Sequence, residues 1–248
     1  MRKNFDAPAV KQACVEWIRA WFAENGPLCN AVIGISGGKD SSVAAALCAE
    51  ALGPARVIGV LMPDGEQPDI ADSYRVVEAL GIRYTVLNIG EAVAAVEKEI
   101  HGNTDRGMSR QAEINLPPRI RMATLYALSQ SNNGRVVNTC NYSEEYVGYS
   151  TRWGDNTGDF SPLWALTTDE VVAIGLLCEK LPADLVRKVP SDGLCGQTDE
   201  DRFGFSYDQL NAYIHEGSDA VSEEIRGKIE AMHSKNLFKQ KPIPYFPL

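Results

Sequence analysis

The sequence predicts an α/β fold in which one doubly wound parallel sheet carries helices on both faces. Short runs rich in β-branched residues alternate with segments of helical periodicity, and several of those segments close at a Gly or an Asn-Gly pair. A glycine-rich turn also separates the first of these runs from the helical segment after it. Such alternation is typical of right-handed βαβ units, which build a parallel sheet.

The expected elements follow from this alternation in chain order. An amphipathic helix comes first, over residues 8–24, and packs either on the chain's own core or on a second subunit. Its apolar face consists of Val10, Cys14, Trp17, Ile18, Trp21 and Phe22. Strands are expected at 30–35, 56–61, 83–87 and 135–139. Helices are expected between them at 41–52, 69–80, 91–100 and 119–131.

The length of 248 residues allows one substantial core, so we expect a single domain. Its parts are the N-terminal helix, an α/β core over about 30–185, and a C-terminal loop with helices over about 188–248, which together span 1–248. A capping box from Thr167 to Glu170 predicts the start of an apolar helix. The connections 101–117 and 188–204 exceed the usual loop length and are expected to be substrate lids or disordered.

Composition argues against membrane and nucleic-acid partners. The sequence has no uninterrupted apolar run of the roughly 18 residues that a membrane span needs. Its net charge of −9 opposes a broad nucleic-acid surface, because phosphate neutralisation requires clustered Lys and Arg. The six cysteines lack C-x-x-C spacing and indicate reduced thiols in a cytoplasmic protein without an export signal. Cys195, in a polar stretch, is either a small loop residue or a reactive thiol.

The segment 34–42, GISGGKDSS, matches parts of three motifs. A nucleotide P-loop is excluded, because Ile33 stands where that motif needs Gly and Asp40 where it needs Ser or Thr. The G-x-S-x-G pattern of a hydrolase nucleophile is disfavoured, because no earlier strand supplies the loop for an oxyanion hole. A loop that binds pyrophosphate uses all of the polar residues and is favoured.

Each residue of that loop has a physical role in binding phosphate. Gly37 and Gly38 let the backbone turn tightly, and the N–H groups of the next helix point at the anion. Asp40 would repel phosphate unless a cation lies between them, which implies Mg²⁺. Hydroxyl donors are added by Ser36, Ser41 and Ser42. A plain strand-to-helix turn capped by Asp40 would explain the glycines but not these polar groups.

Ser-Gly-Gly-x-Asp-Ser after a first strand resembles the signature of the ATP-pyrophosphatase superfamily, which adenylates a substrate oxygen and has an adenine nucleotide alpha-hydrolase-like, Rossmann-like fold. Three further stretches resemble the NAD synthetases in order. They are NLPPRIRMATLYALSQ at 115–130, NYSEEYVGYSTRWGDNTGDFSPL at 141–163, and KVPSDGLCGQTDEDRFGFSYDQLNAYI at 188–214.

The resemblance implies a set of site residues. It implies ATP contacts by Ser36, Gly37, Gly38, Lys39, Asp40, Ser41, Ser42, Met62, Arg119, Thr139 and Lys188. It implies substrate contacts by Arg121, Trp153, Asp155 and Asp159. Asp40 and Glu144 would bind the metal, and Asp40 and Lys188 would be catalytic.

Several of these residues could instead have a purely structural role. Arg119 and Arg121 either supply cations for phosphate or carboxylate, or only flank a helix start. Glu144 follows a strand end and fits either a metal ligand or an exposed first-turn glutamate favoured by the helix dipole, whereas Glu145 fits mainly the exposed glutamate. Trp153 would serve equally well in a core or an interface.

The resulting expectation is an ammonia-dependent NAD synthetase that joins ammonia to deamido-NAD, uses Mg²⁺ and ATP through an acyl-adenylate, and forms a homodimer. A separate amidase domain for glutamine is not expected. Rivals are a GMP-synthetase-type pyrophosphatase, a tRNA-modifying relative, and a catalytically silent nucleotide-binding module. The chain departs from the family pattern at Pro117-Pro118, in the short loop before Gln197, and in its tail, which reads HSKNLFKQKPIPYFP.

Overall fold

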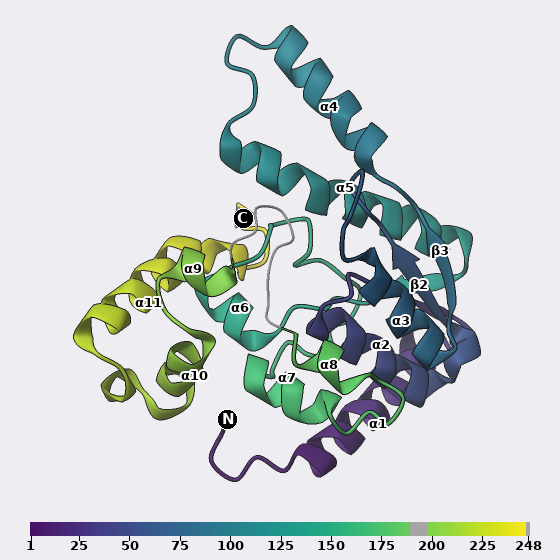
Figure 1. Cartoon of the computed structure of the whole chain (residues 1–248), viewed down its shortest axis with the longest axis vertical. Coiled ribbons are helices and arrows are strands. Elements are labelled where there is room, and N and C mark those ends of the chain that lie inside the picture. Colours follow the sequence, from purple (N-terminus) through teal and green to yellow (C-terminus); the bar gives the residue numbers. More distant parts are fainter. Residues whose placement is uncertain (189–197, 247–248) are drawn as a thin grey trace.

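The computed structural model describes residues 1–188 and 198–246. Its centre is a four-stranded sheet in the order β3-β2-β1-β4 (Figure 1). All three strand pairings are parallel, with Ala31 opposite Val57 and also opposite Arg135. The strands are β1 (Asn30–Gly34), β2 (Val57–Leu61), β3 (Arg83–Val86) and β4 (Gly134–Val136). The four expected strands are therefore confirmed in position and order along the chain.

Helices cover both faces of this sheet. The helices are α1 (Ala7–Asn25), α2 (Lys39–Leu52), α3 (Ile70–Leu80), α4 (Gly90–Asn103), α5 (Arg110–Ser131), α6 (Tyr142–Val147), α7 (Thr168–Gly175), α8 (Ala183–Val186), α9 (Asp199–Phe203), α10 (Tyr207–Glu216) and α11 (Glu223–Asn236). Short 3-10 turns lie at η1 (Pro54–Arg56), η2 (Ser218–Ala220) and η3 (Leu237–Lys239). The doubly wound α/β class is confirmed.

Alternate residues of the central strand point to two separate cores. Ala31 and Ile33 pack among the side chains of α1, α2, α3 and α7. Val32, between them, packs with α4 and α5 on the opposite face. Because neighbouring side chains of a strand point to opposite faces, both faces of β1 are apolar, as is typical of a buried parallel strand.

The N-terminal helix packs on this core. Val15, Ile18 and Phe22 of α1 are at most 1% exposed. The Trp21 ring stacks on Phe160 with 4.7 Å between ring centroids, whereas Trp17 stays 43% exposed. The face expected to cover either the core or a second subunit therefore covers the chain's own core.

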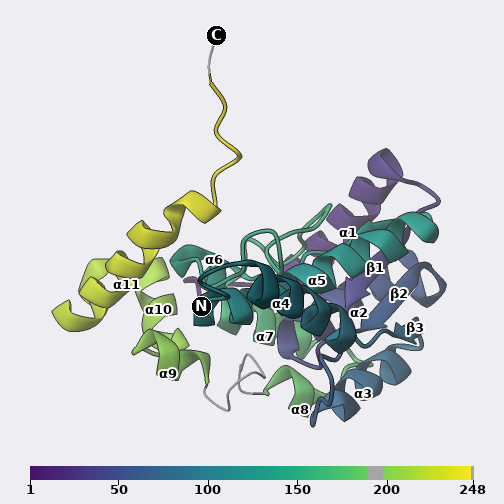
Figure 2. The ribbon, with the colours of Figure 1, turned by 90° about the horizontal axis from the view of Figure 1, so that it is seen from above.

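A third group of helices lies beside the sheet. Figure 2 shows α9, α10 and α11 together at one side, with residues 241–246 extending away from them. Their shared apolar cluster contains Phe203, Leu210 and Ile229, and Val147 of α6 joins it. Helix α6 therefore connects the sheet to the C-terminal helices. Among the described residues, no helix combines the length and apolarity needed to cross a bilayer.

The expectation of one long loop over residues 101–117 is wrong. Helix α4 continues to Asn103, and α5 begins at Arg110, where the Ser109 side chain accepts a hydrogen bond from the Ala112 amide. The sequence predicted a helix only from residue 119, whereas α5 runs through Pro117 and Pro118. Packing of this half of α5 against α4 and the sheet outweighs the missing proline donors.

The expectation of a long loop over residues 188–204 is also partly wrong. Thr198 and Asp201 form a capping box, in which the Asp201 amide donates to the Thr198 hydroxyl at 3.2 Å and the Thr198 amide donates to the Asp201 carboxylate at 3.0 Å. This reciprocal pair starts α9. Cys195 lies outside the described residues, and so does the rest of 189–197. The capping box expected at Thr167 is confirmed and starts α7.

The described cysteines are free thiols. Burial raises the pKa of Cys14 and of Cys178 to about 11. Cys29, Cys48, Cys140 and Cys178 are buried, and Cys14 is partly buried. Thiols in these surroundings are poor nucleophiles because the thiolate form is disfavoured.

Gly175 and Gly227 give a matched test of the packing between α2, α7 and α8. A Cβ on Gly175 would lie 2.6 Å from Val43 Cγ2 and 2.8 Å from Val186 Cγ1, whereas a Cβ on Gly227 of α11 would meet nothing within 4 Å. We expect Gly175→Ala to lower the free energy of unfolding by about 1–3 kcal/mol through overpacking. Gly227→Ala should raise it by about 0.5–1 kcal/mol through helix propensity. Urea denaturation measures both, and equal effects would contradict the close packing at Gly175.

Candidate functional site

The candidate site lies where the strand order reverses. The chain runs from β1 outward to β2 and β3, and then returns to the other side of β1 as β4. Residues 36–38 leave the carboxyl end of β1, and residues 138–141 leave that of β4. Crevices at such switch points are the usual ligand sites of open α/β sheets.

The loop after β1 turns tightly because of Gly37. Its φ of +79° is one that L-residues rarely adopt, and a Cβ there would lie 2.8 Å from Asp72 Cβ and 2.9 Å from the Ser73 amide nitrogen. The loop therefore packs directly on the first turn of α3. Only glycine satisfies both the dihedral and the contact.

Serine hydroxyls hold the loop from within. The Gly38 amide donates to Ser36 Oγ at 3.2 Å, and the Ser36 and Ser41 hydroxyl oxygens are 3.1 Å apart. The Ser42 hydroxyl donates to the Gly38 carbonyl at 2.6 Å. No side chain caps the start of α2, whose N-cap is Gly38. The first amides of this 14-residue helix are thus an electropositive end for an anion.

Asp40 connects the two strand ends. Its Oδ1 accepts a hydrogen bond from the Asn141 amide at 3.1 Å, and its Oδ2 pairs with Lys39 Nζ at 2.8 Å. Asn141 also caps α6, because its Oδ1 accepts from the Glu144 amide at 3.1 Å. Asn141 thus places Glu144 close to Asp40. Glu144 lies on α6, which is only six residues long.

Two carboxylates and one buried ammonium group set the electrostatics of this group. Burial, and then the charge of Asp40, raise the pKa of Glu144 well above its ordinary value. Burial opposes the charge of Lys39, but the carboxylates of Asp40 and Glu144 outweigh it and raise the pKa of Lys39. Lys39 is only 4% exposed, so one buried cation serves two carboxylates.

Residues Asp40 and Glu144 fit a magnesium ion that is bound together with phosphates. Within 1–188 and 198–246, no cluster of three or more His, Cys, Asp or Glu side chains suits a metal by itself. Mg²⁺ differs from metals held in all-protein cages, because one or two carboxylates with substrate phosphates and waters suffice for it. Asp40 and Glu144, held at one edge of the sheet through Asn141, would supply these two carboxylates.

Two residues of the C-terminal helices, Asp199 and Tyr207, complete this group together with Tyr149 after α6, and the sequence analysis did not single them out. The Tyr207 ring lies 5.6 Å from Lys39 Nζ, and its hydroxyl donates to the buried Asp199 at 3.1 Å. The Tyr149 hydroxyl donates to the other Asp199 oxygen at 3.3 Å. Asp199 and Tyr207 lie in the third stretch that resembles the family, which was the available signal.

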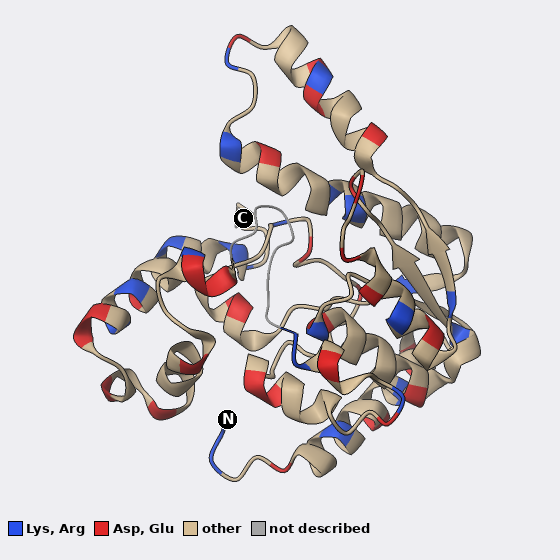
Figure 3. Cartoon of the chain, in the orientation of Figure 1, with Lys and Arg blue, Asp and Glu red and all other residues tan. Residues whose placement is uncertain are grey.

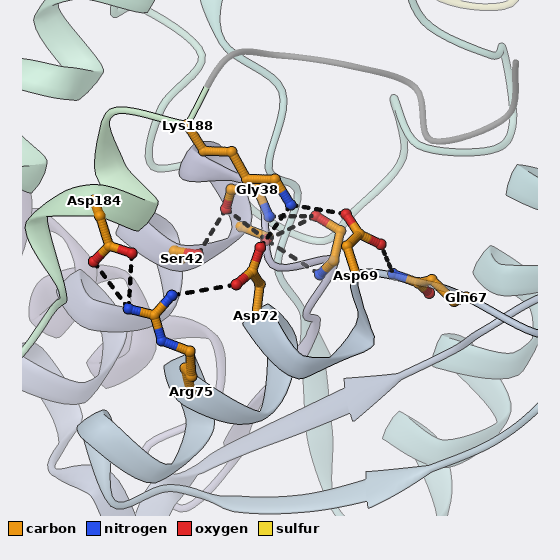
Figure 4. A network of polar contacts seen from close by, with 10 residues as sticks. Gly38, Ser42, Gln67, Asp69, Asp72, Arg75, Asp184 and Lys188 are labelled. Carbon is orange, nitrogen blue, oxygen red and sulfur yellow. Dashed lines mark hydrogen bonds and ion pairs between the residues drawn. The ribbon is translucent and has the colours of Figure 1, made fainter. Parts of the chain in front are cut away.

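Lys188 is held over the loop by α3. Figure 4 shows its ammonium group directed between Asp69 and Asp72, and Nζ lies 2.8 Å from an oxygen of each. Arg75 extends this network, because its Nη1 lies 3.3 Å from Asp72 Oδ1 and its Nη2 bonds both Asp184 oxygens, at 2.9 and 2.8 Å. The predicted phosphate-binding lysine is therefore close to the loop but paired with acids of the chain itself.

The two predicted arginines lie differently. Arg121 is partly buried, and its Nε donates to the Met62 carbonyl at 3.0 Å. Burial lowers its pKa, against the charges of Asp64 and Asp155. Arg119 is exposed and donates to the Arg152 carbonyl at 3.2 Å. Helix α5 begins at Arg110, so both arginines lie well inside it. The alternative that they only flank a helix start is therefore wrong.

The remaining predicted residues lie on and after β4. Thr139 is partly buried, and Trp153 is 54% exposed with the Arg152 guanidinium 5.0 Å above its ring. Asp155 Oδ1 accepts from the Thr151 amide at 2.6 Å. Asp159 lies at the outer edge of β4, where its Oδ2 accepts from the Val136 amide at 2.7 Å and its Oδ1 accepts from the Tyr126 hydroxyl at 3.2 Å.

Glu145 corrects the expectation of an exposed glutamate. Its side chain is 2% exposed, and in the described part of the chain neither carboxylate oxygen has a hydrogen-bond partner. Burial raises its pKa. The expectation is wrong because α6 lies between the site and the C-terminal helices, which bury both of its sides.

A cavity of about 380 Å³ lies elsewhere, between α4 and α5. Its lining includes Glu97, His101 and Arg110 and none of the loop residues. Acidic and basic residues are interspersed along the helices (Figure 3).

Comparisons with known proteins show the family and the fold of the chain. The family described as NAD synthase matches residues 10–243. An NH(3)-dependent NAD(+) synthetase from Pyrococcus furiosus is 36% identical over 229 residues, which cover 87% of each chain. The solved structure of an NMN synthetase from Francisella tularensis has a TM-score of 0.88 at 30% identity and covers 98% of this chain and 99% of that one. An NH3-dependent NAD synthetase from Campylobacter jejuni, at 24% identity, TM-score 0.80, and coverage of 98% and 100%, shows the same fold.

Substitutions at Gly37 and Gly38 test two different properties of the loop, its folding and its contacts with a ligand. Gly37→Ala should lower the free energy of unfolding by about 2–4 kcal/mol, because it combines a left-handed dihedral with a backbone clash. Gly38 has φ −81°, and its added Cβ would meet only Ser36 Oγ, at 3.3 Å. Gly38→Ala should therefore leave stability within about 0.5 kcal/mol and weaken Mg-ATP binding at least about tenfold. Urea denaturation and calorimetric titration measure the two effects, and equal destabilisation by both variants would overturn this division.

Proposed function

Because the chain belongs to the NAD synthase family, we propose that it amidates the nicotinate carboxylate of deamido-NAD with ammonia, at the expense of ATP. The carboxylate attacks the α-phosphate of ATP, pyrophosphate leaves, and ammonia displaces AMP from the acyl-adenylate. The single observation that supports this most strongly is the hydrogen bond from Asn141 to Asp40, which brings the pyrophosphate-type loop and Glu144 to one edge of the sheet.

The chain's own groups would bind and orient the phosphates. The uncapped start of α2 and the serine hydroxyls face the place where pyrophosphate would leave. Lys39 and Lys188 would supply positive charge, with Lys188 exchanging Asp69 and Asp72 for phosphate oxygens. Asp40 and Glu144 would hold Mg²⁺, which neutralises the charge of the phosphates when bound.

The second substrate candidate is nicotinic acid mononucleotide. The protein of the Francisella tularensis structure is named NMN synthetase, and its backbone matches 98% of this chain. Amidation of the mononucleotide uses the same nicotinate carboxylate and the same loop. The two substrates differ only in an adenylyl half.

We also propose a homodimer and a cytoplasmic location. The dimer rests on the resemblance to the NAD synthetases and on apolar side chains such as Tyr84 and Val86, which are 45% and 40% exposed. The location rests on the free thiols among the described cysteines.

Substrate identity is the first test of the proposal. Purified protein with Mg-ATP and ammonium should convert deamido-NAD to NAD and release AMP and pyrophosphate, with a rate that rises with pH as NH₄⁺ gives way to NH₃. Nicotinic acid mononucleotide, XMP and ammonia-free glutamine are assayed in parallel by chromatography. Preference for the mononucleotide would select the second candidate, and activity on XMP alone would refute the proposal.

Removal of each carboxylate tests the metal site. Asp40→Asn and Glu144→Gln should each cut the amidation rate at least about a hundredfold, because each removes a ligand charge at the phosphates. In Mg²⁺-free buffer Glu144→Gln should also raise the melting temperature, since it removes the cost of burying a carboxylate and then its repulsion from Asp40. Calorimetric scans with and without Mg²⁺ measure this change.

Glu216→Gln is the matched control, because Glu216 is an exposed glutamate at the end of α10. It should change neither the rate nor the melting temperature. Glu145→Gln should change the stability, because Glu145 is buried, and should affect the rate less than Glu144→Gln does. Equal rates for the two variants would mean that Glu144 is not the ligand.

A further inference from the structure

Ser143 of α6 lies in a buried chain of hydrogen bonds that reaches two other helices. The residue is fully buried, and its hydroxyl donates to Asn211 Oδ1 of α10 at 2.6 Å. The same hydroxyl oxygen accepts from the amide of Thr168, the first residue of α7, at 3.0 Å. Three helices that are separated in sequence therefore meet at one hydroxyl group.

Asn211 uses both ends of its side-chain amide. Its oxygen accepts from Ser143, and its nitrogen donates to Asp169 Oδ1 at 3.0 Å. Asp169 is fixed in turn, because its Oδ1 also accepts from the Thr167 hydroxyl at 2.6 Å. Asn211 is only 3% exposed, so loss of either partner leaves a buried polar group unpaired. A side chain with one acceptor and one donor is needed at this position, and asparagine supplies both.

Helix α6 depends on contacts of this kind for its direction. A helix of six residues is too short to be stable alone, so neighbouring elements set its position. At its far end, side chains of residues 236–240 donate to backbone carbonyls within residues 145–148. At its start, Asn141 bonds Asp40 on the site side, and Ser143 bonds α7 and α10 on the other.

Glu144 lies next to Ser143 on the first turn of this helix. Because successive residues of an α-helix project about 100° apart, the two side chains leave the helix in different directions. Burial, and then the charge of Asp40, raise the pKa of Glu144, so its carboxylate lies on the Asp40 side. A rotation of α6 that broke the Ser143 bonds would also move the Glu144 carboxylate relative to Asp40.

We propose that Ser143 and Asn211 are positioning residues for Glu144, and that they hold its carboxylate beside Asp40 where both can bind Mg²⁺ together with the phosphates. This inference rests on the proposed function. Ser143 and Asn211 act through α6 and touch neither substrate nor metal, because their polar atoms are bonded to each other and to α7. The bond between α6 and α10 thereby fixes the spacing of two carboxylates at the edge of the sheet.

Ser143→Ala and Asn211→Leu test this role, because each removes the bond between α6 and α10, and leucine keeps the size of asparagine. We expect each to lower kcat about tenfold, since small misplacements of reacting groups are costly. The free Mg²⁺ concentration for half-maximal rate should rise about threefold or more, whereas the KM for the nicotinate substrate should change less than about twofold. The double variant should be no worse than Asn211→Leu, because the same bond is lost in each.

Val15→Ala is the matched control for a general loss of stability. Val15 is 1% exposed in the core under α1, and α1 carries none of the proposed site residues. The substitution should lower the melting temperature by leaving a cavity. It should keep kcat and the Mg²⁺ dependence within about twofold of the parent. Ser143→Ala removes a single oxygen atom, so it decides the question if Asn211→Leu does not fold.

A second readout uses the Mg²⁺-free protein without substrate. In the parent, Glu144→Gln should raise the melting temperature, because it removes a buried carboxylate and then its repulsion from Asp40. If Ser143 holds the carboxylate there, the rise should shrink to less than about half in a Ser143→Ala background. In a Val15→Ala background the rise should be undiminished, because independent effects on stability add. Calorimetric scans measure these changes.

The outcomes separate the inference from the proposed function. An undiminished rise in the Ser143→Ala background would overturn the positioning role, and so would a kcat of Ser143→Ala within about twofold of the parent. An equal loss of kcat in Val15→Ala, or no rise in the parent, would also overturn it. A parent protein that amidates neither nicotinate substrate would refute the proposed function, while the scans would still decide whether Ser143 holds Glu144 beside Asp40.

Discussion

The hydrogen bond between the Asn141 amide and the Asp40 carboxylate joins two strand ends that lie 101 residues apart in sequence. The sheet order makes this bond possible, because β4 returns to the free side of β1 and brings its carboxyl end beside the loop. Gly37 lets the loop turn onto α3, and Asn141 caps α6 while it holds Asp40. The site is therefore built from local turn chemistry that a single switch in strand order brings together.

The same geometry creates an electrostatic competition. The free protein already pairs its site cations with its own acids, Lys39 with Asp40 and Lys188 with Asp69 and Asp72. A bound triphosphate must displace or share these partners, so part of its attraction is offset by lost ion pairs. In return, the cations are held near the loop before the ligand arrives, which reduces the cost of ordering their long side chains.

The sequence was sufficient for the sheet and the loop, because both depend on local signals. Runs of β-branched residues marked the strands, and two adjacent glycines with a following Asp-Ser pair marked the loop. It failed where tertiary packing decided the result. Pro117 and Pro118 favour a break by their own chemistry, yet α5 continues through them because its flank is packed. Glu145 resembles any first-turn glutamate, and only the packing of the C-terminal helices on α6 buries it.

The support of α6 by residues 236–240 also has a consequence for the order of assembly. Ribosomes make the chain from its N-terminus, so the strands, the loop and α6 are synthesised before Lys239 and Gln240 exist. A nascent chain can pair β1 with β4 and join Asn141 to Asp40 while the carbonyls at the end of α6 still face water. The contacts that join the phosphate loop to Asn141 need no residue beyond 141, whereas the end of the helix that carries Glu144 gains its contacts with Lys239 and Gln240 only after these residues have been made.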